Sequence, residues 1–348
     1  MRGAAACAGA VPNRASTALS DIPNNRVILI LGAPRSGTSW LAKIFDSHPD
    51  VLYRHEPDTV LRNETLPWMC PPKDTPIYQQ AAEAYLRQLI DTATLKSAGS
   101  LPIFPKRHRG MLATRIRSGI IYGLHAIELA RVTQPWARCV RIPDGLDLAE
   151  HPELRVVLKS VSSRGRAGLF AHALPGARII LIVRDPFGQI ASMLRGEALG
   201  MFEDDIPTAE VLMTEEAKHY ELTPERFASL PIIEQFAWNW AVLNEKAIND
   251  LAGIPTAHVL RYQDLGANPA EQARGLLAFC GLDWDPQTEA FVRNSTTHSG
   301  PDRYYQVMKD TPEAMNRWRK ELSLDDQHRI LAVVRQTSLA SYCPEINA

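Results

Sequence analysis

The sequence is poor in the features that mark secreted, metal-binding and polyanion-binding proteins. Its 348 residues contain five cysteines, an odd number at irregular spacing, with no Cys-x-x-Cys pair. Neither a disulfide framework nor a zinc site is therefore expected, and a reducing compartment is the simplest account. The 38 basic and 39 acidic residues give a net charge of −1, so no nucleic-acid partner is expected either.

Residues 1–24 also lack a long apolar run. They are rich in alanine, with proline, asparagine and serine between. A secretory or membrane-spanning segment needs a longer apolar stretch, about 20 residues for a span. We expect a disordered tail, no transmembrane segment and a cytoplasmic protein. A transit peptide remains an alternative, because Arg2 and Arg14 precede the first acid, Asp21.

What the sequence does have is an alternation of strand-like and helix-like segments. Apolar runs typical of buried strands occupy residues 26–31, 50–54, 155–160, 178–184 and 257–262. Helical patterns occupy residues 37–47, 77–97, 109–132, 165–174, 187–198, 231–252, 269–280 and 324–337. This alternation predicts an α/β fold, a parallel sheet covered by helices on both faces. We expect one domain over 25–340, with helical insertions at about 60–150 and 199–230.

The most informative segment is Arg26–Trp40. An apolar strand runs into a loop from Gly32 to Gly37, and a helical pattern follows. A strand, a glycine loop and a helix N-terminus together form an anion cradle, because backbone N–H groups and the helix dipole both favour negative charge. The loop is similar to G-x-x-x-x-G-K-[ST], but Thr38 stands where that motif has its lysine. It should therefore hold phosphate without the lysine that ATP-binding loops use.

A second strand ends in charge at Arg184-Asp185-Pro186. Arginine offers a planar fork for a phosphate. Asp185 could instead be a magnesium ligand of a nucleotide triphosphatase, or the pair could be a solvated strand end. In parallel sheets ligands bind beyond the carboxyl ends of the strands, so both motifs can hold one nucleotide.

These two motifs together resemble the sulfotransferases that use 3′-phosphoadenosine 5′-phosphosulfate (PAPS). Pro34–Leu41 resembles their 5′-phosphosulfate loop, P-[KR]-[ST]-G-[ST]-[ST]-x-[LFM]. The segment Val183–Pro186 resembles their V-R-[DN]-P strand end, where arginine and a later serine hold the 3′-phosphate. The resemblance implies a P-loop-like three-layer sandwich and a release of adenosine 3′,5′-bisphosphate. It implies a nucleotide site made of Arg35, Ser36, Gly37, Thr38, Ser39, Arg184 and Ser192.

Two downstream segments extend the resemblance. Val259–Leu265 is similar to the V-x-Y-E-D-L strand end of the family, and we expect it to be architectural. Ser299–Leu322 is similar to the C-terminal stretch of tyrosylprotein and carbohydrate sulfotransferases, which closes over the nucleotide in relatives. Lys309 is therefore a phosphate-binding candidate, although a solvated lysine is an equal alternative.

The resemblance also implies catalytic residues. Arg35 would stabilise the oxygen that leaves the sulfuryl group, and Lys159 would neutralise the sulfuryl oxygens. Phenol and steroid sulfotransferases take their base from K-[TS]-H, but Val161 occupies that histidine position here. The segment Val51–Pro57 instead resembles the F-[YL]-x-E-P of carbohydrate sulfotransferases, which makes Glu56 the expected base. His55 is the rival, and in an extended segment its side chain would point away from that of Glu56.

The sequence thus predicts a PAPS-dependent sulfotransferase that needs no metal and acts on a hydroxyl of a carbohydrate or glycoconjugate. A tyrosyl or other phenolic acceptor is the nearest alternative. A P-loop kinase or NTPase and a non-catalytic nucleotide-binding module are more distant ones. We expect the basic run Lys106–Arg109 to be a solvated helix start rather than an acceptor-binding site. The sequence leaves the oligomeric state open.

Overall fold

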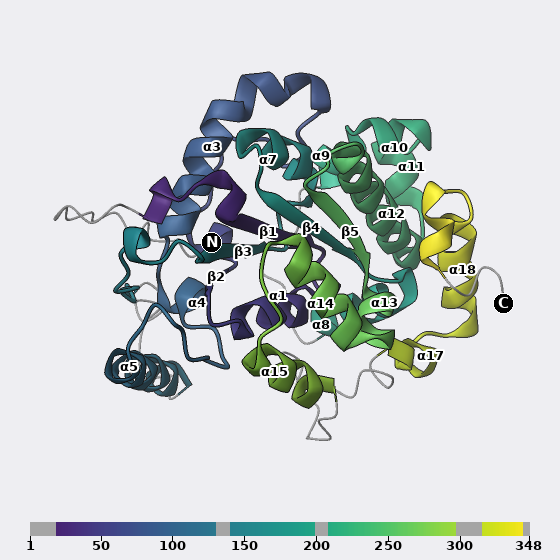
Figure 1. The fold of residues 1–348 in the computed structure, drawn as a ribbon. Helices are drawn as coiled ribbons and strands as arrows, with labels where there is room; N and C mark the ends of the chain where they lie inside the picture. The colour runs from purple at the N-terminus through teal and green to yellow at the C-terminus, as the bar shows by residue number, and fades with distance from the viewer. Residues whose placement is uncertain (1–18, 130–139, 199–207, 297–314, 344–348) are drawn as a thin grey trace.

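The computed structural model describes residues 19–129, 140–198, 208–296 and 315–343. Within them, five parallel strands form one sheet in the order β2-β3-β1-β4-β5 (Figure 1). The strands are β1 (Val27–Gly32), β2 (Val51–His55), β3 (Arg155–Ser160), β4 (Arg178–Val183) and β5 (Ala257–Arg261). All five predicted strands are confirmed to within two residues at each end.

Helices cover both faces of the sheet and make three layers (Figure 1). One face packs on α3 (Thr75–Asp91), α7 (Ala167–Ala173), α8 (Pro186–Ala198) and α12 (Ile232–Leu251), with α18 (Leu324–Val334) against α12. The other face packs on α1 (Thr38–Ser47), α13 (Tyr262–Ala267), α14 (Pro269–Phe279) and α15 (Pro286–Thr296). The predicted three-layer α/β architecture is confirmed.

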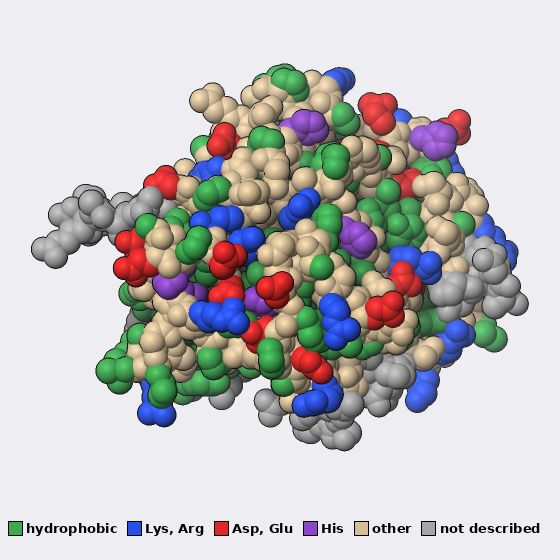
Figure 2. Space-filling model, in the orientation of Figure 1, with side chains coloured by type: hydrophobic (Ala, Val, Ile, Leu, Met, Phe, Trp, Pro, Cys, Tyr) green, Lys and Arg blue, Asp and Glu red, His purple; other side chains and the backbone are tan. Residues whose placement is uncertain are grey.

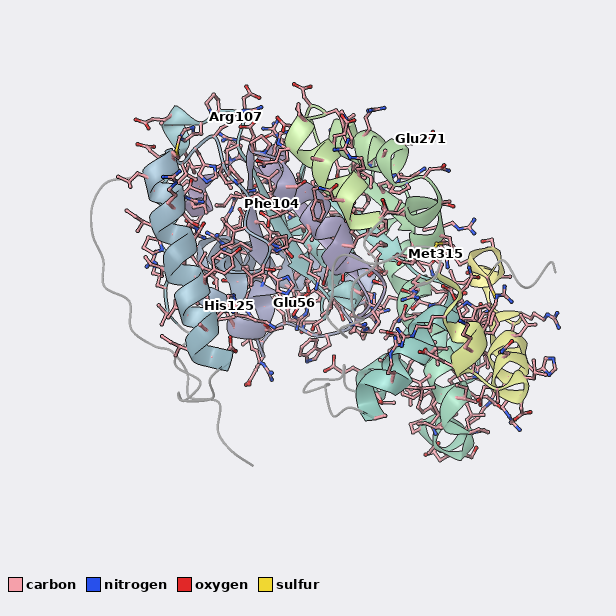
Figure 3. The ribbon with its side chains drawn as sticks, turned by 90° about the horizontal axis from the view of Figure 1, so that it is seen from below. Glu56, Phe104, Arg107, His125, Glu271 and Met315 are labelled. Carbon is pink, nitrogen blue, oxygen red and sulfur yellow. The ribbon has the colours of Figure 1, made fainter. Side chains whose placement is uncertain are left out.

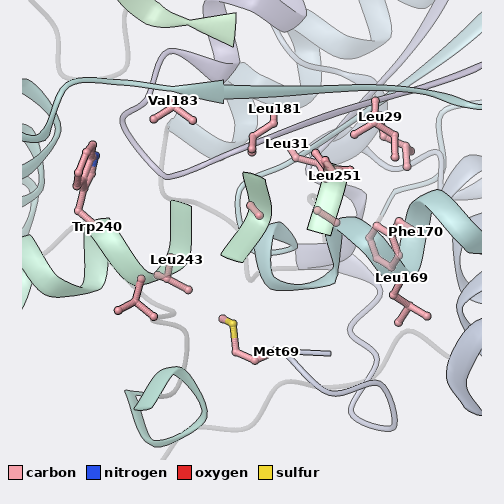
Figure 4. Packing of buried hydrophobic residues seen from close by; sticks show 14 of the residues in the cluster. Leu29, Leu31, Met69, Leu169, Phe170, Leu181, Val183, Trp240, Leu243 and Leu251 are labelled. Carbon is pink, nitrogen blue, oxygen red and sulfur yellow. The ribbon is translucent and has the colours of Figure 1, made fainter. Parts of the chain in front are cut away.

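The alternation of side chains along each strand explains the two cores. In β1, Leu29 and Leu31 point into the α12 layer, whereas Ile28 and Ile30 point into the α1 layer. Figure 4 shows the first layer, where Leu29 and Leu181 of the sheet belong to the same cluster as Leu251 of α12. Because both faces are buried, the strands are continuous apolar runs rather than alternating ones.

The boundaries of two predicted segments were wrong. Residues 19–24 belong to the folded domain and not to the predicted tail, because Ile22 is fully buried against the core. The predicted helix 77–97 is two helices, α3 and α4 (Leu95–Ala98). The predicted helix is interrupted at Thr94 because this residue is the N-cap of α4. Its hydroxyl accepts a hydrogen bond from the backbone N–H of Ser97.

Both expected insertions contain helices. The first holds α2 (Pro57–Val60), α3, α4 and α5 (Met111–Leu129), and the second holds α9 (Thr208–Leu212), α10 (Glu215–His219) and α11 (Pro224–Ser229). The last described helix before α18 is α17 (Trp318–Glu321). Among the residues that the structure describes, no helix is long and apolar enough to cross a bilayer.

Candidate active site

The predicted site residues lie at one edge of the sheet. In the register of the strands, β1 lies between β3 and β4, with Ile30 beside both Lys159 and Ile180. Neighbouring strands are about 4.8 Å apart, so the loop after β1 lies one strand spacing from the ends of β3 and β4. Glu56 follows β2, one strand further out. The two predicted motifs therefore converge, as the strand order requires.

The loop after β1 is shaped by two glycines. Gly37 has a φ of +93°, and a Cβ there would overlap the ring of Tyr262. A Cβ on Gly32 would come within 2.6 Å of Thr38 and 2.8 Å of the Ile182 carbonyl. Only glycine therefore allows the chain to turn this tightly into α1.

The N-terminus of α1 is open to an anion. Its N-cap, Gly37, provides no side-chain hydrogen bond to the first turn. The first N–H groups of a helix have no partner within the helix, so those of Thr38 and Ser39 are suited to a phosphate. The hydroxyl of Ser36 donates to the Ala33 carbonyl at 2.8 Å, and its N–H donates to the same atom at 3.2 Å. Both bonds stabilise the loop.

Arg35, Arg184 and Ser192 meet beside this loop. Arg35 Nε donates to the hydroxyl of Ser192 at 2.9 Å, and an Arg184 terminal nitrogen donates to the Arg35 carbonyl at 3.1 Å. Arg195 also donates to the Ser192 hydroxyl, at 3.3 Å. Residues 157 positions apart in the chain thus form one basic cluster. Such a cluster can bind a phosphate through several charge-assisted hydrogen bonds.

Aromatic side chains hold Arg184 in place. The Arg184 guanidinium lies over the ring of Tyr262, 4.9 Å from its centroid, and Trp240 donates to the Arg184 carbonyl at 3.0 Å. Trp40 meets Tyr262 edge to face. The expected architectural role of the Val259–Leu265 segment agrees with these contacts. Lys309 lies outside the described residues.

Asp185 is engaged in structural contacts. One carboxylate oxygen accepts from the Gly188 N–H at 2.6 Å, and the other accepts from Gln263 at 2.6 Å. The first bond caps the start of α8. Burial raises the pKa of Asp185, although Arg184 and these hydrogen bonds act against it. Within the described parts of the chain, no group of three His, Cys, Asp or Glu residues could hold a metal ion.

Glu56 lies at the end of β2 and faces two lysines. The amine of Lys159 donates to one of its carboxylate oxygens, and the Lys96 amine is 3.4 Å from the other. The Glu56 N–H donates to the Lys159 carbonyl at 2.8 Å. Lys159 is almost wholly buried, whereas 39% of the Lys96 side chain is exposed. Figure 3 labels Glu56 at the same edge as the His125 end of α5.

The expected opposition of His55 and Glu56 was wrong. Glu56 has a φ of +45°, so the extended backbone ends at His55 and the alternation of side chains ends with it. His55 Nε2 consequently lies 3.9 Å from a Glu56 oxygen, and its Nδ1 is hydrogen-bonded to the Tyr53 hydroxyl at 2.8 Å. Both rival bases therefore lie next to each other.

The charges on Glu56 and the two lysines, and the burial of His55, set the protonation states here. Burial disfavours a charge on Glu56, but the amines of Lys159 and Lys96 outweigh burial and hold its pKa below the usual range. Burial, aided by the nearby Lys159, lowers the pKa of His55 from 6.5 to about 3. At neutral pH the carboxylate is ionised and the imidazole is neutral.

Comparison with known proteins identifies the family. A family model described as "Sulfotransferase family" matches residues 27–286, three quarters of the chain. This chain belongs to the sulfotransferase family.

The chain is also similar to curated relatives and to solved structures. The chain is 23% identical over 316 residues to carbohydrate sulfotransferase 1 of Mus musculus, covering 86% of this chain and 74% of that protein. It is 24% identical over 330 residues to carbohydrate sulfotransferase 6 of Homo sapiens, covering 87% and 77%. The sulfotransferase domain of the Synechococcus PCC 7002 olefin synthase has a TM-score of 0.43 at 18% identity, over 91% of this chain and 96% of that one. Mouse sulfotransferase SULT7A1, solved in complex with PAP, has a TM-score of 0.39 at 12% identity, over 93% and 89%.

The basic run of this sulfotransferase is not the solvated helix start that we expected. Lys106 is buried and lies 3.0 Å from a carboxylate oxygen of Asp46, and Arg107 pairs with Asp50 and Asp285. His108 is buried as well. These ion pairs join the first insertion to the core of the domain. The sequence could not show them, because the acidic partners lie far from the basic run along the chain.

Two residues that the motifs did not predict also contact the candidate site residues. Lys96 reaches Glu56 from α4, and Arg195 joins the cluster around Ser192. Arg195 lies three residues after Ser192 on α8, a helical spacing that could have indicated it. Nothing in the sequence around Lys96 marks it, because its approach depends on how the insertion folds back.

Proposed function

We propose that this sulfotransferase transfers the sulfuryl group to a hydroxyl of a carbohydrate or glycoconjugate. The observation that carries the proposal is Glu56, a carboxylate that accepts a hydrogen bond from Lys159, whose strand lies next to the strand that leads into the anion loop. The base histidine of phenol and steroid enzymes is absent, because Val161 occupies its position. Relatives named carbohydrate sulfotransferases, which match 86% of this chain at 23–24% identity, support the same acceptor class.

The donor supplies the sulfuryl group, and the residues present fit its two separated anionic ends. The N-terminus of α1, with Thr38 and Ser39, suits the 5′-phosphosulfate, because its N–H groups have no side-chain cap. Arg184 and Ser192 suit the 3′-phosphate, which distinguishes PAPS from other adenine nucleotides. Arg195 adds a further cation on the same serine.

Arg35 is proposed to stabilise charge on the leaving oxygen. Its backbone lies in the left-handed region, with a φ of +68°, and its side chain reaches Ser192 of the candidate 3′-phosphate site. A guanidinium carries five donors, so the bond from Nε to Ser192 is compatible with a second bond to a phosphate oxygen. One side chain can in this way orient both ends of the donor.

Glu56 is proposed to accept the proton of the acceptor hydroxyl at a carboxylate oxygen. Its lowered pKa keeps it ionised but makes it a weak base while Lys159 is bonded to it. The basicity of Glu56 rises when the Lys159 amine turns toward other negative oxygen atoms. Lys159 would then couple donor binding to activation of the base.

An acceptor screen tests the proposal. The protein is incubated with PAPS and a mixed set of neutral sugars, acidic oligosaccharides, glycolipids, phenols and tyrosyl peptides, and sulfated products are detected by mass spectrometry. Sulfated carbohydrate made by the protein, and not by Glu56→Gln, is the expected result. Sulfated phenol or tyrosine alone would overturn the acceptor class, and magnesium-dependent turnover of ATP would overturn the assignment of the site residues.

A further inference from the structure

Helix α5 is oriented with its apolar residues outward. Six of the eleven large hydrophobic side chains that are exposed in the described structure belong to this one helix. They are Met111 (73% exposed), Leu112 (73%), Ile116 (56%), Ile120 (48%), Tyr122 (53%) and Ile127 (40%). In Figure 2 the hydrophobic side chains gather at the lower left, where Figure 1 places α5.

The polar side chains of α5 are the ones that join it to the domain. Arg117 donates to the carbonyls of Pro143 and Ala98 at 2.8 and 2.9 Å, and His125 donates to that of Gly99 at 2.9 Å. Of its large apolar side chains with described surroundings, Ile121 is the one that is fully buried, in a small cluster with Leu95. This arrangement is the reverse of an ordinary surface helix, whose apolar stripe faces the core. An outward apolar face of this size marks an interaction site.

Basic residues outnumber acidic ones around this face, where the acid on α5, Glu128, lies 3.6 Å from His125. Between Thr92 and Ile127 the chain has six Lys and Arg residues and no Asp or Glu. Several of these cations pair with acids of other elements, but Arg115 is exposed on α5 itself, and 59% of the Arg107 side chain and 39% of the Lys96 side chain are exposed. This surface is complementary to a partner that has an apolar layer with negative charge at its edge.

The size of the face favours a lipid surface over a second copy of the chain. A helix of 19 residues is about 28 Å long and roughly 10 Å wide, which presents on the order of 300 Å². A stable protein interface needs about 800 Å² from each partner. A bilayer requires no matching shape, and helices with outward apolar side chains and basic residues lie in the headgroup layer.

We propose that the outward face of α5 is a docking surface for an anionic lipid bilayer. Met111, Leu112, Ile116 and Ile120 enter the boundary between headgroups and acyl chains, and Arg115 meets the lipid phosphates. Because α5 packs against α4, whose Lys96 reaches Glu56, the docked protein carries its candidate base close to the membrane surface. This inference goes beyond the proposed function, and lipid docking does not depend on the acceptor class.

Flotation with vesicles tests the docking. The full-length protein is mixed with vesicles of phosphatidylcholine, with or without phosphatidylglycerol, and should bind much more tightly to the mixture. A variant with Leu112→Ser, Ile116→Ser and Ile120→Ser should bind at least tenfold more weakly. The matched control carries Ile77→Ser, Ile232→Ser and Leu324→Ser, three residues that are 71%, 60% and 74% exposed on other elements, and should bind like the parent.

Two further variants separate lipid docking from the alternatives. Gly119 and Gly123 are on α5 with open space where a Cβ would be, so Gly119→Leu with Gly123→Leu enlarges the apolar face. Lipid binding should then be retained or tightened, whereas a helix pair between two copies would be blocked. Arg115→Glu should reduce binding to the anionic vesicles only.

The outcomes that overturn the proposal are distinct. Failure of the parent protein to float on the mixed vesicles, or equal binding by the serine variant and its control, removes the lipid surface. A dimer in sedimentation velocity that the double leucine variant dissociates assigns the face to a second copy. Circular dichroism confirms that each variant is folded, and Arg115→Glu remains a test if the serine variant is not. Nucleotide binding and turnover of a soluble acceptor report on the proposed function separately.

Discussion

The amine of Lys159 at the end of β3 is hydrogen-bonded to the carboxylate of Glu56 at the end of β2, and β3 lies next to β1, the strand that leads into the anion loop. The pair joins the expected base to the expected cation for the sulfuryl oxygens. It also explains why Glu56 stays ionised although it is largely buried, because two lysines outweigh the cost of burial.

Replacement of Glu56 by glutamine should separate catalysis from nucleotide binding. Glutamine keeps the size of the side chain but cannot accept the acceptor's proton. We expect kcat to fall about 10²–10⁴-fold, the usual worth of a general base, with little change in the affinity for adenosine 3′,5′-bisphosphate. Steady-state kinetics and calorimetry measure the two effects. Near-normal turnover in Glu56→Gln, together with an inactive His55→Asn, would transfer the role of base to His55.

Arg184 should confer selectivity for the 3′-phosphate. A lost charge-assisted hydrogen bond costs about 1.5–3 kcal/mol, which is roughly tenfold or more in affinity. Arg184→Ala should therefore weaken binding of adenosine 3′,5′-bisphosphate at least tenfold and leave the weaker binding of 5′-AMP nearly unchanged. Arg261→Ala, at the end of the neighbouring strand, is the matched control. Equal losses for both nucleotides would show that Arg184 does not bind the 3′-phosphate.

The sequence predicted the sheet and the two anion motifs because local signals determine them. Unbroken apolar runs mark buried parallel strands, and a glycine loop before a helix marks an anion site. The surroundings of Glu56 were only half predicted. Whether His55 and Glu56 face the same way depends on one backbone angle, the φ of +45° at Glu56, and the approach of Lys96 depends on the fold of the insertion. Neither leaves a periodic signal in the sequence.

The lowered pKa of His55 predicts a pH-dependent stability. An unfolded histidine takes up a proton near pH 6.5, whereas folded His55 does so only near pH 3. Between these values the unfolded state binds more protons, so the protein loses stability as the pH falls. From pH 7 to pH 5 the parent should lose about 2 kcal/mol more than His55→Asn, measured by urea denaturation at both values. Parallel losses in the two proteins would show that His55 is not a buried neutral imidazole.

Transfer should persist when divalent metals are removed. Both Asp185 oxygens already accept hydrogen bonds from Gly188 and Gln263, so the carboxylate that could be a magnesium ligand is engaged in holding α8. The fixed cations Arg35 and Lys159 are suited to stabilise the negative charge of a sulfuryl group without a metal ion. Product formation in EDTA should match that in magnesium buffer. A loss of activity in EDTA that magnesium restores would favour the kinase-like alternative.

Gly37→Ala should disable the loop through its backbone. A Cβ at this position would overlap the Tyr262 ring, and the φ of +93° is unfavourable for any residue with a Cβ. The Tyr262 ring carries the Arg184 guanidinium, so its displacement should weaken both halves of the nucleotide site. We expect loss of adenosine 3′,5′-bisphosphate binding in calorimetry and a lower melting temperature. Gly275→Ala is the control, because Gly275 is exposed within α14 with nothing near its missing Cβ, and alanine there should be neutral or stabilise the helix by about 0.5–1 kcal/mol. Gly37→Ala with normal nucleotide affinity would contradict a phosphate-binding role for this loop.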